Sequence, residues 1–212
     1  MEVGIIRPFG PSIAKVKIPK KILNDLNQYV DQVNLDFEKK QKTDIGNTLV
    51  GDVTQEISID PKTAEKIGWL QFLVDCTHEW IRLSIGQKIK SFKLKQSWIV
   101  RQFKNEYNPV HWHSGHISGA GFLKLPDNFG KHVQDKNNHQ YDGGTLNLIH
   151  GTRQFLSQSK LTIRPEVGDF YLFPNYLMHT VYPFKDSEEE RRSISFNAKI
   201  DEEIFDVYGQ GK

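Results

Sequence analysis

The sequence contains a single cysteine, Cys76, among its 212 residues. One thiol cannot form an intrachain disulfide, and a zinc site built from several cysteines is excluded for the same reason. Such cysteine usage is typical of proteins from a reducing compartment. We therefore expect a cytoplasmic protein.

An excess of charge of one sign is also missing. The chain has 28 lysines and arginines against 26 acidic residues, a net charge of +2. Dedicated nucleic-acid-binding domains usually carry a clear basic excess. The lysines within residues 88–95 alternate with apolar residues, a pattern typical of a solvated strand face. We therefore see no strong signal for a nucleic-acid partner.

Long hydrophobic runs are missing as well. No segment approaches the roughly 20 consecutive apolar residues that a membrane-spanning helix needs. Residues 1–4 are not followed by the basic and apolar regions of a secretory signal. We therefore expect neither membrane insertion nor secretion.

The residues that are present are typical of a globular fold, with 37% hydrophobic and 25% charged residues. Apolar residues recur with a period near 3.6 over residues 19–40, which predicts an amphipathic helix. Asp60 followed by Pro61 predicts the start of a second helix, which runs toward Gly86. Between these helices, the alternation of Ile57 and Ile59 indicates a short extended piece.

The chain changes character after residue 91, where β-rich runs alternate with turns. We expect strands at residues 97–103, 118–125, 144–149, 160–163, 169–173, 179–182 and 192–200. Helices first and strands afterwards indicate an α+β fold with a sandwich or barrel. We expect one domain over residues 1–212, with a helical support region at 1–90, a β core at 91–200 and a tail at 201–212. The polar segment 127–142 is expected to be a surface loop or a lid.

The sequence Asn-Pro-Val-His-Trp-His at residues 108–113 is the sharpest local feature. In an extended backbone alternate side chains point to the same face, so His111 and His113 can converge. A third histidine, His179, stands at the start of a later predicted strand. Imidazoles that converge on one point indicate a metal site.

The last predicted strand carries polar residues at every second position. Arg191, Ser193, Ser195 and Asn197 fall on one face, and Arg192 falls on the other. The polar face could be an ordinary outer face, or it could line a barrel and present a guanidinium to a carboxylate. Arg192 is expected to be a solvated surface charge.

Taken in order, these segments resemble the double-stranded β-helix oxygenases that use iron(II) and 2-oxoglutarate. The resemblance is carried by residues 108–113, 117–126, 143–146 and 191–197. It is closer still to a branch of such oxygenases found in bacteria and tailed phages, and it covers about half of the chain. It implies a double-stranded β-helix (jelly-roll, cupin-like) core with the N-terminal helices packed on the sheet.

The resemblance also implies a ligand set. His111 matches the first iron ligand and His179 the distal one, while His113 occupies the position that usually holds a carboxylate. Two alternatives stay open. His113 could be the first ligand, with Gly115 in the second position, or a carboxylate from Asp142 or Asp169 could complete the site. His116 is expected to lie outside the ligand set.

Cosubstrate and activity follow from the same resemblance. Arg191 and Ser193 match the Arg-x-Ser pair that holds the distal carboxylate of 2-oxoglutarate. The implied activity is that of a dioxygenase that uses Fe(II), 2-oxoglutarate and O2, hydroxylates an unidentified small-molecule or peptidyl substrate, and releases succinate and CO2. Two alternatives are a non-catalytic cupin-like metal-binding module and a three-histidine dioxygenase that does not use 2-oxoglutarate. The Arg191 and Ser193 pair favours the first interpretation, because a structural metal site has no use for a carboxylate clamp.

Overall fold

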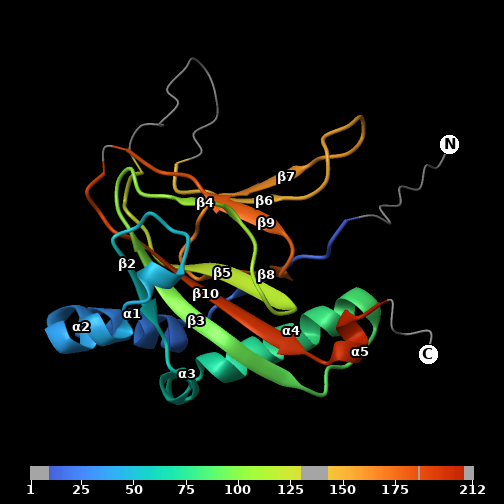
Figure 1. Cartoon of the computed structure of the whole chain (residues 1–212), viewed down its shortest axis with the longest axis horizontal. Coiled ribbons are helices and arrows are strands. Elements are labelled where there is room, and N and C mark those ends of the chain that lie inside the picture. Colours follow the sequence, from blue (N-terminus) through green and yellow to red (C-terminus); the bar gives the residue numbers. More distant parts are fainter. Residues whose placement is uncertain (1–9, 130–142, 186, 208–212) are drawn as a thin grey trace.

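The computed structural model of the chain describes residues 10–129, 143–185 and 187–207 (Figure 1). The helices are α1 (Lys20–Leu35), α2 (Phe37–Thr43), α3 (Pro61–Ile67), α4 (Trp69–Ile85) and α5 (Glu202–Phe205), with a 3-10 turn, η1, at Gly46–Thr48. The strands are β1 (Ala14–Lys17), β2 (Gln55–Ser58), β3 (Phe92–Gln102), β4 (Asn108–His111), β5 (Ile117–Lys124), β6 (Leu146–Ile149), β7 (Lys160–Ile163), β8 (Asp169–Pro174), β9 (Met178–Val181) and β10 (Arg191–Ile200). Most of the segment predicted to be a loop or lid, 127–142, lies outside the described residues.

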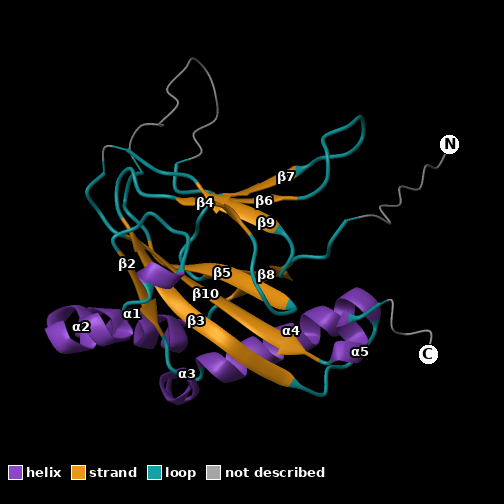
Figure 2. Cartoon of the chain, viewed as in Figure 1, coloured by secondary structure: helices purple, strands orange, loops and turns teal. Residues whose placement is uncertain are grey.

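The strands form two antiparallel sheets that face each other (Figure 2). The larger sheet has the order β1-β8-β5-β10-β3-β2, and the smaller sheet has the order β4-β9-β6-β7. Most neighbouring strands are not consecutive in the chain, as β10 shows by pairing with both β3 and β5. This arrangement is a double-stranded β-helix, which confirms the fold class that the sequence resemblance implied.

The larger sheet separates two hydrophobic cores. Its side chains alternate between them: Phe170 and Leu172 belong to the core shared with the helices, whereas Tyr171 and Phe173 belong to the core shared with the smaller sheet. The helices lie against the outer face of the larger sheet (Figure 2). That outer face is therefore buried, and polar residues on it lie under helices instead of in solvent.

Each of the two predicted helical regions is broken once. Asp36 ends α1 with an extended backbone. Its side chain accepts a hydrogen bond from the amide of Lys39 and so caps the start of α2. Gly68 adopts a left-handed conformation, with φ of 83°, and separates α3 from α4. The predicted cap at Asp60 is confirmed, since its carboxylate accepts from the amides of Lys62 and Thr63.

All seven predicted strands are present, with β7 at the predicted bounds and the others shifted by a few residues at one end or the other. The largest difference is in β3, which begins at Phe92 because its first half pairs with the end of β10. The pattern did not predict β1, whose residues 14–17 pair with β8 at the sheet edge.

Gly119 shows why β5 contains small residues. A Cβ atom at this position would lie 2.6 Å from the ring of Phe196 and 2.7 Å from the carbonyl oxygen of Tyr171. Real carbon contacts are about 1 Å longer. The glycine therefore lets the rings beneath β5 pack directly against its backbone.

Candidate metal and cosubstrate site

Three histidine side chains meet between the two sheets. His111 ends β4, His179 lies in β9, and His113 follows β4 by two residues. The nitrogen atoms that they can offer to a metal all lie within 4.8 Å of one another. The ring centroids are between 4.2 and 4.9 Å apart. The structure thus brings together the three histidines that the sequence indicated.

The position of His113 depends on a neighbouring turn and not on strand alternation. β4 ends at His111, so His113 lies in a loop. Its amide donates to the carbonyl oxygen of Asn175 at 3.1 Å, and the side-chain amide of Asn175 donates back to the carbonyl oxygen of His113 at 3.1 Å. Asn175 follows β8 directly. No sequence pattern predicts this role of Asn175, because a single asparagine in a turn is common.

Hydrogen bonds at the far side of two rings set their protonation. Nδ1 of His111 lies 2.7 Å from the carbonyl oxygen of Pro109, and Nδ1 of His179 lies 2.9 Å from that of Leu177. A carbonyl oxygen can only accept, so both Nδ1 atoms carry the hydrogen and both Nε2 atoms keep a free lone pair. Nε2 of His179 lies 3.1 Å from Nε2 of His113.

Burial keeps these imidazoles neutral. It lowers the pKa of His113 to about 3 and that of His179 to about 4, with a smaller contribution from the neighbouring histidines. The pKa of His111 is lowered as well, again by burial. Neutral imidazoles are the form that binds divalent transition metals. The donor set therefore fits an Fe(II) ion.

In the described part of the chain no carboxylate joins the three histidines. Asp169 is buried, but it forms ion pairs with Lys15, at 2.8 Å, and with Lys17. Asp142 lies outside the described residues. His116 also lies elsewhere: its Nδ1 accepts from the amide of Ile200, and its ring stacks on Phe205.

Arg191 lies deep between the sheets, only 2% exposed. Its guanidinium donates to the carbonyl oxygen of Gly144, to Oε1 of Gln102 and to the hydroxyl of Ser193, each at 3.1 Å. These acceptors are all neutral, and no carboxylate of the described residues pairs with Arg191. Burial accordingly lowers the pKa of Arg191 to about 10. A buried guanidinium that finds no counter-ion among the described residues has the chemistry to bind an anion.

The histidines and the arginine share one cavity. A narrow space of about 30 Å³ is lined by the three imidazoles, Arg191 and Ser193, together with apolar side chains that include Phe122. A second cavity of about 230 Å³ is also lined by His111 and His113, together with Glu56 and Trp112. The two imidazoles are therefore reached from an inner cavity with a cation and an outer cavity with a carboxyl group. The sequence pattern did not single out Glu56, which lies in the short strand β2.

The structure corrects the interpretation of Arg192. Its side chain points away from the barrel as the alternation predicts, but it is 3% exposed instead of solvated. It donates to both carboxylate oxygens of Glu190, at 2.9 and 3.0 Å, and to Asp31 of α1 at 2.8 Å. The reason is that helix α1 covers this face of the sheet. Burial alone would raise the pKa of Glu190, but Arg192 and Arg101 lower it below its usual value.

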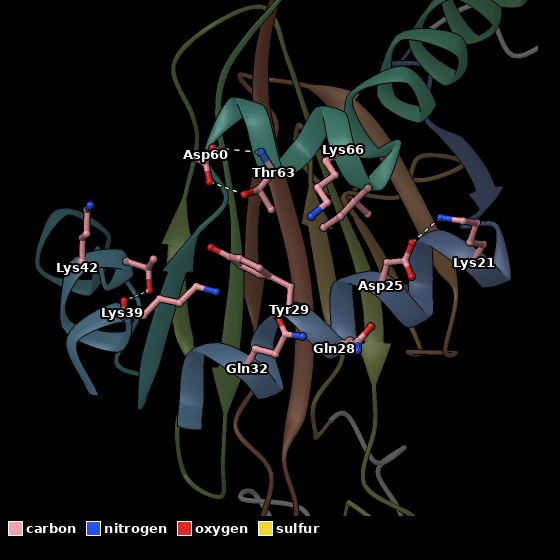
Figure 3. A pocket seen from close by; sticks show the side chains of 12 residues that line it. Lys21, Asp25, Gln28, Tyr29, Gln32, Lys39, Lys42, Asp60, Thr63 and Lys66 are labelled. Atoms are coloured by element: carbon pink, nitrogen blue, oxygen red, sulfur yellow. Dashed lines mark hydrogen bonds and ion pairs between the residues drawn. The ribbon is translucent and has the colours of Figure 1, made fainter. Parts of the chain in front are cut away.

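A roomier cavity of about 580 Å³ lies in the helical layer, among α1, α2 and α3. Figure 3 shows several lysine side chains around it, with the ring of Tyr29 at its centre. Its acidic groups are already engaged, since Asp25 pairs with Lys21 and Asp60 caps α3. It contains none of the three clustered histidines, so the chemistry is better placed at the narrower cavity.

Comparisons with known proteins agree with this site. Residues 96–197, just under half of the chain, match the model of a family described as "Putative 2OG-Fe(II) oxygenase". This segment includes all three histidines and Arg191. A search of curated protein sequences found no match.

Several solved structures share the fold. A prolyl-4-hydroxylase from Pseudomonas putida is 15% identical, with a TM-score of 0.58 over 87% of this chain and 91% of that chain. The viral collagen prolyl hydroxylase of Paramecium Bursaria Chlorella virus-1, solved with 2OG, is 16% identical, with a TM-score of 0.53 over 88% and 94%. HygX from Streptomyces hygroscopicus, solved with nickel, 2-oxoglutarate and hygromycin B, is 12% identical, with a TM-score of 0.55 over 89% and 82%.

None of the helices in the described residues combines the length and the apolar character that crossing a membrane requires. The fold, the matched segment and the donor set at its centre agree with one another. Residues 96–197 are similar to the Fe(II)- and 2-oxoglutarate-dependent oxygenases, whose cofactors are Fe(II) and 2-oxoglutarate.

Proposed function

We propose that this protein is a 2-oxoglutarate-dependent hydroxylase in which His111, His113 and His179 hold the iron. The observation that carries the proposal is the shared cavity: three neutral imidazoles and a buried guanidinium, with which no carboxylate of the described residues pairs, line the same 30 Å³ space. A purely structural metal site would explain the imidazoles but not Arg191. An oxygenase that must hold a dicarboxylic acid beside its metal explains both.

In this proposal Arg191 and Ser193 bind the distal carboxylate of 2-oxoglutarate. Ser193 already accepts a hydrogen bond from Arg191, which leaves its own hydroxyl hydrogen free to donate to an anion. Gln102 and Gly144 hold the guanidinium from the other directions, so it is fixed before the anion arrives. The cavity is narrow, and side chains that line it, such as Phe122, must change rotamer to admit a five-carbon diacid.

When bound, Fe(II) and 2-oxoglutarate supply the oxidising chemistry, in which O2 converts the oxo acid to succinate and CO2 and one oxygen atom enters a substrate C–H bond. The chain supplies geometry around them. The carbonyl groups of Pro109 and Leu177 keep two imidazoles in the tautomer that coordinates through Nε2. The apolar side chains of Trp98 and Leu146 limit the access of water to the inner cavity.

The outer cavity is the proposed substrate site. It opens on the same two imidazoles, His111 and His113, and its volume of about 230 Å³ suits a side chain or a small molecule. Of the proteins with this fold, prolyl hydroxylases act on prolyl residues, as their names state, and HygX was solved with hygromycin B. We accordingly expect either a peptidyl or a small-molecule substrate for this protein.

An anaerobic titration tests the function. Fe(II) and 2-oxoglutarate added together should give a visible charge-transfer band that neither gives alone, because both must bind at one centre. Addition of O2 should then release succinate. If no band forms, and the protein still binds Zn(II) as tightly as Fe(II), it is a metal-binding module. If no band forms but O2 is consumed with a substrate, it is a three-histidine dioxygenase that uses no oxo acid.

A further inference from the structure

We propose that the outer cavity binds a substrate with a cationic group, an ammonium or a guanidinium, and that the carboxylate of Glu56 recognises this group. That the bound molecule is a substrate rests on the proposed function. That the cavity recognises a cation is argued separately, from the surroundings of Glu56.

Glu56 is buried, and one of its carboxyl oxygens is unsatisfied. It is 1% exposed, and its Oε2 atom forms no hydrogen bond with any of the described residues. No arginine or lysine of the described residues pairs with its carboxyl group, although such groups are rarely buried unless they are paired. An unsatisfied buried carboxyl group costs stability. A protein that keeps one beside a cavity needs it for something other than folding.

The carboxyl group faces the outer cavity, which His111 and His113 also line. One further oxygen atom lies near it, on Asn108. A Cβ atom at Gly51 would lie 3.2 Å from Oε1 of Glu56 and 3.0 Å from Oδ1 of Asn108. Glycine therefore lets the loop that follows η1 approach these two oxygen atoms closely. An acceptor without a donor among the described residues, as Oε2 of Glu56 is, is complementary to a group that only donates, such as an ammonium or guanidinium.

The charge of Glu56 responds to what binds. Burial, with a smaller contribution from the neighbouring carboxylate of Asp44, raises its pKa to about 7. A cation placed against Glu56 would favour the ionised form and form a charge-assisted hydrogen bond with it. An anion would be repelled by both carboxyl groups. The outer cavity therefore selects for positive charge, while the inner cavity, with Arg191, selects for negative charge.

Part of the remaining wall suits the stem of a long cationic side chain. Leu49 and Val50 line the outer cavity beside polar residues, and so does Trp112, whose side chain is exposed at the rim. An apolar stretch of wall near a carboxylate matches a lysyl or arginyl side chain, whose methylene groups bury along apolar surface while the charged head pairs. Such a substrate would lie with its stem between Glu56 and the imidazoles.

Binding to the metal-free protein tests the inference without catalysis. The probes are Nα-acetyl-L-lysine amide and Nα-acetyl-L-arginine amide, compared with Nα,Nε-diacetyl-L-lysine amide and Nα-acetyl-L-glutamate amide, which carry no positive charge. Trp98 and Trp112 line the cavity, so tryptophan fluorescence reports occupancy. We expect both cationic probes to bind at least tenfold more tightly than the other two.

The variant Glu56→Gln keeps the shape of the side chain and removes its charge. We expect it to weaken the binding of the cationic probes at least tenfold. The control Glu65→Gln, at an exposed position of α3, should leave probe binding unchanged. The thermal midpoint of Glu56→Gln should equal or exceed that of the wild type, because a buried carboxyl group is removed. A lower midpoint would assign Glu56 to folding and overturn the proposal.

Two outcomes separate this inference from the proposed function. If the wild type forms the band with Fe(II) and 2-oxoglutarate but binds the four probes alike, the cation site is wrong and the oxygenase stands. If the cationic probes bind through Glu56 but no band forms, the cation site stands and the hydroxylase is wrong. Equal binding of the lysine probe by the wild type and Glu56→Gln would also refute the inference.

Discussion

His111 and His179 are register partners across the pair formed by β4 and β9, with ring centroids 4.2 Å apart. Two residues from distant parts of the sequence are thus fixed opposite each other by backbone hydrogen bonds. His113 completes the cluster from a loop that Asn175 holds. Two of the proposed ligands therefore rest on the sheet and the third on a turn.

This arrangement predicts that removing a ligand and removing the residue that holds a ligand have different effects on iron binding. We expect His111→Ala and His179→Ala to abolish Fe(II) binding, because the loss of either strand-borne imidazole leaves two ligands at most. Asn175→Ala should weaken Fe(II) binding about tenfold to 100-fold, the effect typical of losing a group that orients a ligand. Equilibrium dialysis under anaerobic conditions measures both effects. His150→Ala, at an exposed position, is the matched control and should bind iron normally; retention of iron by His179→Ala would refute the ligand assignment.

The buried histidines predict that the metal-free protein is destabilised by acid. An unfolded histidine titrates near pH 6.5, whereas the folded pKa is about 3 for His113 and about 4 for His179. Below pH 6.5 the unfolded chain therefore binds more protons, and the free energy of unfolding falls by about 1.4 kcal/mol per proton for each pH unit. Urea unfolding at pH 7.5, 6 and 5 measures this slope.

The variant His113→Gln supplies the control for that slope, because it removes one of the titrating groups. Its unfolding free energy should fall less steeply between pH 6 and pH 5, by roughly one proton. A wild-type protein that is equally stable at pH 5 and pH 7.5 would contradict the burial of neutral imidazoles.

Arg191→Ala should raise the 2-oxoglutarate concentration needed for half-saturation about 100-fold, since a charge-assisted pair of hydrogen bonds to the cosubstrate is lost. Arg191→Lys keeps the charge but not the planar fork, and it should show a smaller loss. The charge-transfer band measured against 2-oxoglutarate gives both values. Ser193→Ala should fall between the wild type and Arg191→Ala; an unchanged half-saturation in Arg191→Ala would place the carboxylate elsewhere.

Arg192 is predicted to act on stability and not on cosubstrate binding. Its removal leaves Glu190 with Arg101 as its remaining arginine partner and breaks the ion pair with the exposed Asp31, so the lost charged hydrogen bonds of Arg192→Ala should lower the free energy of unfolding by about 1.5–3 kcal/mol. Lys199→Ala breaks an exposed ion pair with Glu202 and should cost less than about 1 kcal/mol.

Arg192 also joins α1 to the β core, and we propose that the two regions form one domain. Denaturation of the wild type should then follow one cooperative transition in both helix and tryptophan signals. Two separate transitions would show that the helical region folds on its own.

The pattern of residues predicted much of this fold because local rules decide it. Alternation in β10 placed Arg191 and Ser193 on one face, and the structure has them on the barrel side. The cap at Asp60 and the strand at 160–163 follow from capping and from period-2 patterning, which depend on neighbours in the sequence.

Residue patterns were less informative wherever a contact comes from a distant segment. The prediction that Arg192 is solvated was wrong. Alternation tells which face of the strand a side chain is on, but it does not tell that α1 covers that face. The support of His113 by Asn175 depends on the turn after β8. The unpartnered carboxyl group of Glu56 appears only when β2 and the loop around η1 are placed beside the histidines.

The sequence by itself determined which side chains carry chemistry: the spacing of His111 and His113, the later His179, and the alternation that begins at Arg191. Tertiary structure alone decided that their nitrogen atoms converge within 4.8 Å, which of them are buried, and which charges lack a partner. The physical reason is that convergence and desolvation depend on how the two sheets and the helices pack, and packing brings together residues that no local pattern relates.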